Sequence, residues 1–160
     1  MERNRSAAKI PVTPRFKTGM TATSDYAARL APLNQKTLAL WAADCAGHVL
    51  SHFETRHPTD DRPRQAIEAA RSWARGETTM RMARAAAVKA HAAARETVHP
   101  AAVAAARAAG HAAATAHMIQ HARGAAAYAI VSAAADATTQ QQNSAITAER
   151  EWQIAKLARP

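Results

Sequence analysis

Hydrophobic residues recur along this chain three and four positions apart, which is the spacing of one face of an α-helix. The clearest case runs from Asn34 to Glu54, and its apolar residues share one face: Leu38, Trp41, Ala42, Cys45, Val49 and Phe53. Asn34 can cap the N-terminus of such a helix, and Pro58 ends the segment. The pattern therefore predicts one helix over residues 34–54.

A second helix is predicted from Pro63 to Arg75. Asp60 or Asp61 is placed to cap it, Pro63 suits a first turn, and Gly76 is placed to stop it. One side of this helix is apolar and the other is polar. The apolar side consists of Ala66, Ile67, Ala69, Ala70, Trp73 and Ala74.

The pattern continues as helices over residues 78–98, 100–137 and 145–157. Gly110 and Gly124 interrupt the second of these, and each marks either a close contact between helices or a break. Few β-branched or aromatic runs occur, so an extensive sheet is not expected. The fold class predicted is all-α, a compact alanine-rich bundle of about five helices.

Residues 1–33 are expected to form an extended or disordered basic arm, because proline and glycine punctuate them. A short turn of helix from Asp25 to Leu30 is compatible with this. Residues 34–160 are expected to form one helical-bundle domain, which their length allows.

Alanine dominates the second half of the chain, supplying 28 of the 55 residues from Ala83 to Ala137. It is the best helix former but too small to fill a core, so helices faced with it must approach closely. The large side chains between them then matter most. Trp41, Trp73 and Trp152 are expected to anchor the core.

The chain is basic, with a formal net charge of +9, of which residues 1–20 carry +4 (five Lys and Arg against Glu2). Nucleic-acid binding through the arm is one interpretation, but a solvated basic tail is the favoured one, because aromatic residues that could stack on bases are few. No apolar stretch of membrane-spanning length is present. The single Cys45 cannot form an internal disulfide, which fits a cytoplasmic location.

Two histidine pairs have the i,i+4 spacing of metal ligands on a helix: His48 with His52, and His117 with His121. The glutamate of a zinc-protease motif is absent from both, and no cysteine pair or carboxylate cluster lies near in sequence. We therefore expect no metal and no cofactor. The histidines are expected to form hydrogen bonds across a close-packed bundle.

A second hypothesis makes the chain an enzyme or a small-molecule-binding bundle. In it, His91, His111, His117 and His121 meet in a pocket alongside Tyr128, where an imidazole could act as a general acid or base. Three histidines around a cavity would favour this hypothesis. Histidines that face outward or bind backbone carbonyls would favour a protein-binding module.

Arginines gather around the second predicted helix, and a carboxylate from Asp44, Asp60 or Asp61 is expected to pair with one of them. Such a pair would clamp the turn between the first two helices. The arginines are Arg62, Arg64, Arg71 and Arg75.

Several segments, taken in order, resemble one family. They are WAADCAGHVL at Trp41–Leu50, DRPRQAIEAARSW at Asp61–Trp73, AHAAAR at Ala90–Arg95, AAGHAAATAH at Ala108–His117, GAAAYA at Gly124–Ala129 and EREWQ at Glu149–Gln153. Together they resemble the all-helical immunity proteins of bacterial polymorphic toxin systems, the fifth-numbered immunity family.

The resemblance implies a cytoplasmic protein that binds and neutralises a cognate toxin and catalyses nothing. Immunity proteins against basic nucleases tend to be acidic, so the basic charge here argues against a nuclease toxin or requires a locally acidic binding face. The toxin's identity and the oligomeric state do not follow from the sequence. The residues expected to bind are exposed polar ones near the motifs: Asp44, Asp61, Arg62, Arg64, Arg71 and Arg95.

Overall fold

The computed structural model describes residues 26–157, and within that range the chain is all-helical, as predicted. It contains seven helices, more than the five or so expected. They are α2 (Gln35–Val49), α3 (Ser51–Glu54), α4 (Arg62–Ala74), α5 (Met80–Glu96), α6 (Pro100–Ala114), α7 (His121–Asp136) and α8 (Gln142–Leu157).

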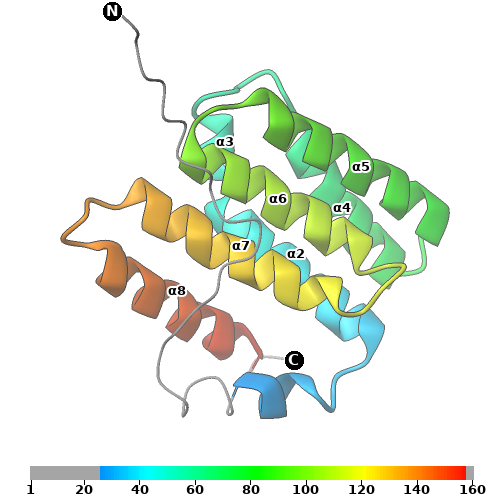
Figure 1. The fold of residues 1–160 in the computed structure, drawn as a ribbon. Coiled ribbons are helices and arrows are strands. Elements are labelled where there is room, and N and C mark those ends of the chain that lie inside the picture. The colour runs from blue at the N-terminus through cyan, green and yellow to red at the C-terminus, as the bar shows by residue number, and fades with distance from the viewer. Residues whose placement is uncertain (1–25, 158–160) are drawn as a thin grey trace, which may run out of the picture.

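The helices pack in two layers around α6 (Figure 1). α5, α6 and α7 lie side by side, α2 and α4 lie behind them, and α8 lies against α7. α6 is buried along most of its length, and its buried residues are alanines and one glycine. The small side chains therefore let the central helix contact neighbours on several sides at once.

The starts and stops of the first helices follow the local signals in the sequence. The Asn34 side chain accepts a hydrogen bond from the Thr37 amide at 2.9 Å and caps α2. Gly76 has a φ of +78° and ends the turn after α4, as expected of a residue without a Cβ. The predicted single helix over residues 34–54 is instead two, because the chain turns at Leu50 between α2 and α3.

The predicted helix over residues 100–137 is likewise two, α6 and α7, which break at residues 115–120 rather than at either glycine. Thr115 ends α6, and its hydroxyl donates to the His111 carbonyl at 3.1 Å. Gln35 of α2 donates from Nε2 to the carbonyls of Thr115 and Ala116, at 2.8 and 3.2 Å. A side chain from a distant helix thus satisfies carbonyls that the end of α6 leaves free.

The tryptophans do not play equal roles. Trp41 is buried and donates from Nε1 to the Gln153 carbonyl at 3.0 Å, and Trp152 packs against the core from one side. Trp73 is half-buried and is not among the side chains packed against the hydrophobic core, so its expected role as a core anchor was wrong. The core is filled instead by Phe53, Ile67 and many alanines.

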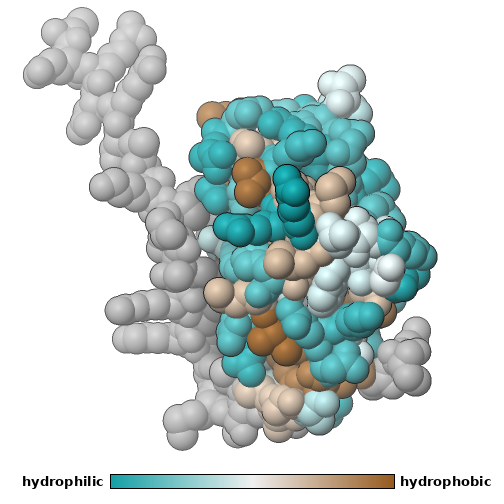
Figure 2. Space-filling view, turned by 90° about the vertical axis from the view of Figure 1, so that its right-hand side faces the viewer, coloured by the Kyte–Doolittle hydropathy of each residue, from teal (hydrophilic) through white to brown (hydrophobic). Residues whose placement is uncertain are grey.

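The end of the predicted arm lies within the described residues. Residues 26–30 are helical, and Leu30 is buried in the core. The basic positions of residues 1–20 lie outside the described residues, so the arm and the domain boundary at residue 33 stay predictions. No helix within residues 26–157 has the length and apolarity needed to cross a membrane. On the side shown in Figure 2, hydrophobic residues lie in small groups among hydrophilic ones.

Candidate functional site

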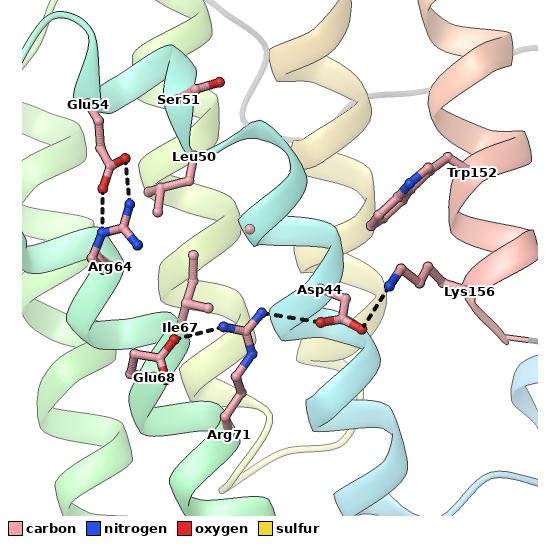
Figure 3. Close-up of a pocket in the computed structure, with 11 residues that line it drawn as sticks. Asp44, Leu50, Ser51, Glu54, Arg64, Ile67, Glu68, Arg71, Trp152 and Lys156 are labelled. Carbon is pink, nitrogen blue, oxygen red and sulfur yellow. Dashed lines mark hydrogen bonds and ion pairs between the residues drawn. The ribbon is translucent and has the colours of Figure 1, made fainter. Parts of the chain in front are cut away.

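A groove of about 430 Å³ lies between α2, α4 and α8 and is lined mostly by charged side chains (Figure 3). Three of the predicted binding residues, Asp44, Arg64 and Arg71, lie in it. Trp152 and Lys156 form its α8 side. The groove therefore joins parts of the chain that the sequence separates by about a hundred residues.

Ion pairs connect the groove's charged groups to one another. Arg64 donates two hydrogen bonds of 2.7 Å to Glu54, one to each carboxylate oxygen. Arg71 donates to Glu68 at 2.7 Å and to Asp44 at 3.2 Å, and Lys156 lies 3.8 Å from Asp44. The pairing of Asp44 with an arginine is thereby confirmed, and it ties α4 to α2.

Arg62 lies outside the groove and binds two carboxylates. Its Nη2 donates to Asp60 at 2.6 Å and to Glu96 at 2.5 Å. The hydrogen bonds to Asp60 and Glu96 raise the pKa of Arg62, and they lower the pKa of each carboxylate. The Asp61 side chain accepts from Gln65 Nε2 at 2.7 Å. Arg95 is exposed on α5 and has no ion pair within residues 26–157.

The first histidine pair is directed at separate partners. His48 Nδ1 lies 2.7 Å from Glu149 Oε2, and its ring stacks on Trp152 with centroids 3.8 Å apart. His52 Nδ1 lies 2.8 Å from Ser132 Oγ, which in turn donates to the Ala101 carbonyl at 2.8 Å. Both histidines therefore bind other helices, as the hydrogen-bonding interpretation expected.

Four of the remaining histidines converge: His91 of α5, His111 of α6, His121 of α7, and His117 in the turn between α6 and α7. His111 Nδ1 lies 2.9 Å from His121 Nδ1, and the ring centroids of His91 and His117 lie 5.2 and 5.1 Å from those of His111 and His121, respectively. Tyr128 stacks on His111 with centroids 5.2 Å apart. We call these five residues the imidazole cluster. These are the five residues that the second hypothesis placed in one pocket.

Gly110 and Gly124 leave space for the rings of the imidazole cluster because they have no side chain. A Cβ on Gly110 would lie 2.6–2.8 Å from three ring atoms of His91, and one on Gly124 would lie 2.6 Å from His111 Nδ1. Each glycine is thus a close contact between helices rather than a break. The rings pack on glycine backbone and on one another, and neither the groove nor the apolar pocket beside Leu38 is lined by a histidine.

Burial, followed by the positive charge of the nearby Arg107, lowers the pKa of His91 to about 4. His111 has a pKa of about 4 for the same main reason, with His91 as the next cause. Both rings are therefore neutral at pH 7. No group of three or more His, Cys, Asp or Glu side chains among residues 26–157 has an arrangement that could hold a metal ion.

Two buried polar side chains form connections that the sequence analysis missed. Gln153 donates to the Ala126 carbonyl at 3.1 Å and accepts from the Tyr26 hydroxyl at 3.0 Å. Ser132 of α7 joins His52 of α3 to Ala101 of α6, as described above. Gln153 and Ser132 are polar residues within helices, so nothing in the sequence indicated that they are buried. Cys45 is buried, and burial raises the pKa of its thiol, which does not favour a nucleophile.

A comparison with protein families gives a match over residues 28–160, nearly all of the region described above, to a family described as Imm-5 like putative immunity protein. The chain belongs to this family. Neither the curated proteins nor the solved structures yielded a match.

Membership in the Imm-5 like family agrees with the resemblance drawn from the helical motifs. The matched region contains the groove and the imidazole cluster, and leaves out residues 1–27. Both features therefore belong to the part of the chain that defines the family.

Proposed function

We propose that this chain is an immunity protein that binds a cognate bacterial toxin and neutralises it. The observation that carries the proposal is the match of residues 28–160 to a family of immunity proteins. We place the action in the cytoplasm, where the single buried cysteine is compatible with reducing conditions.

The six polar residues near the motifs remain the predicted binding residues, although Asp44, Arg62 and Arg71 are half-buried rather than exposed. Five of the six fall into two groups by their ion pairs. Asp44, Arg62, Arg64 and Arg71 are already in ion pairs within the chain. Arg95 is exposed without one within the described residues. A residue held by an internal partner must lose or share it on binding, so the two groups need not contribute equally.

The test is co-expression in a bacterial host with the toxin domain encoded beside the gene for this chain. We expect the chain to restore growth and to form a complex with the purified toxin on size-exclusion chromatography. A toxin of similar activity from another locus, used as the control, should stay lethal. Growth arrest that persists at equal abundance of the two proteins, with no complex, would overturn the proposal.

A further inference from the structure

The outer side of α5 carries positive charge that nothing in the described chain neutralises. Arg81, Arg84, Lys89 and Arg95 are exposed, and no ion pair or hydrogen bond joins them to any residue from 26 to 157. Arg107 of α6 is half-buried, equally without such a partner, and acts on His91 together with Arg95. We call these five residues the cationic face.

The arginines in and just after α4, by contrast, all have carboxylate partners. Arg62, Arg64, Arg71 and Arg75 each lie within 3.2 Å of a carboxylate oxygen. The carboxylate of α5 itself, Glu96, is bound to Arg62 and not to a cation of its own helix. Unpaired like charges at helical spacing repel one another slightly, and an acidic partner would relieve that repulsion.

The spacing gives the cationic face a defined shape. At 100° per residue, Arg81, Arg84 and Arg95 lie within one stripe, and the stripe extends about 21 Å along the helix. Met82 and Val88 stand among the cations with 61% and 60% of their surfaces exposed. Arginine combined with adaptable apolar side chains is the composition of a protein-binding surface.

The charge and the apolar residues together indicate what this surface binds. Its positive charge requires an acidic counterpart, and Met82 and Val88 require apolar contact that a phosphate backbone does not offer. α5 contains no aromatic side chain on which a base could stack, apart from the half-buried imidazole of His91. An acidic protein surface satisfies both requirements.

We propose that the cationic face is the surface with which this chain binds its toxin, and that the toxin presents an acidic surface to it. This inference rests on the proposed function and deepens it by naming the contact. It also explains why a basic chain can serve as an immunity protein: the attraction between opposite charges speeds association whichever partner is basic.

The test compares two full-length variants that lose equal charge. The first, R81Q/R84Q/R95Q, removes three cations of the cationic face, and the control, K36Q/R56Q/R123Q, removes three exposed or half-exposed cations of other elements. We expect the first to weaken binding to the neighbouring toxin domain by about 30-fold or more, and the control by less than about threefold, in calorimetry at 150 mM salt. Matching circular dichroism melting curves would show that both variants fold.

Each outcome separates the two proposals. Equal binding by the wild type and both variants would overturn the cationic face while leaving the immunity function standing. No binding by the wild type would overturn the function and the inference with it. A 30-base-pair DNA duplex and an RNA of similar length serve as further probes. If R81Q/R84Q/R95Q loses binding to these but not to the toxin, the face belongs to nucleic acid and the inference is wrong.

Discussion

At the scale of single residues, two imidazoles occupy the space that a side chain larger than glycine would need on the neighbouring helix. His91 of α5 packs on Gly110 of α6, and His111 of α6 packs on Gly124 of α7. Each histidine therefore fixes its own helix against the next one in the chain. His111 is held further by its bond to His121 and by the ring of Tyr128, so it has little freedom to move aside.

A methyl group at Gly124 should therefore destabilise the fold. Gly124→Ala would place a Cβ 2.6 Å from His111 Nδ1, and we expect a loss of about 1–3 kcal/mol in the free energy of unfolding. Gly47→Ala is the matched control, because its nearest neighbour would be Arg71 Nη2 at 3.5 Å. That change should stabilise by up to about 1 kcal/mol through helix propensity. Urea denaturation of both variants checks this, and equal shifts of the same sign would contradict it.

Gln153 is a second residue on which several elements depend. Its side chain and backbone bind Tyr26, Trp41, Ala126 and Glu149, which lie in four different segments. Gln153 is completely buried. If its side chain were removed, water could not readily replace the hydrogen bonds that it makes.

Gln153→Ala should reduce the free energy of unfolding by about 2–4 kcal/mol, because it leaves a carbonyl and a hydroxyl unpaired and opens a cavity. Gln142→Ala, at the exposed start of the same helix, should change it by less than about 0.5 kcal/mol. Thermal melting of the two variants gives the comparison. Similar melting temperatures would show that α8 is not held by the Gln153 side chain.

At the scale of elements, local signals predicted the helices whose ends are determined locally. Asn34, Thr79 and Gly76 cap or stop their helices through contacts within a few residues. The break between α6 and α7 depends on Gln35, which is 80 residues away from Thr115, so no local pattern could reveal it. The second hypothesis predicted that the histidines meet, but not that they come from three helices and surround glycine backbone.

Ion pairs, like helix ends, could be predicted only in part from the sequence. The sequence predicted a pair between one of three carboxylates and one of four arginines, and only the fold shows that Asp44 pairs with Arg71. The cationic face could not be predicted, because a sequence shows which residues are charged but not which of them form ion pairs. Arg95 was predicted as a binding residue for its position near a motif, and only the fold shows that Arg81 and Arg84 accompany it.

At the scale of the whole molecule, positive charge acts on the imidazole cluster from two helices. Arg95 of α5 and Arg107 of α6 both disfavour a proton on His91, in addition to the effect of burial. His121, whose own pKa is lowered by burial and by His117, acts in the same direction. His91 and His111, through which α5 and α6 contribute to the cluster, are therefore neutral at pH 7.

The stability of the fold should consequently fall as the pH drops from about 6.5 to 4. The histidine pKa is 6.5 in an unfolded chain and about 4 for His91 and His111 in the folded one, so the unfolded state binds protons in this window that the folded state does not. Stability is complete above pH 6.5 and is lost towards pH 4, by an amount on the order of 2 kcal/mol after allowance for solvent screening. Urea denaturation of H91Q/H111Q should give a shallower dependence over the same window. The carboxylates whose pKa is lowered, Asp60, Glu77 and Glu96, are the same in the wild type and the double variant, so the comparison isolates the histidines. An identical slope for the wild type and the double variant would show that other groups cause the loss.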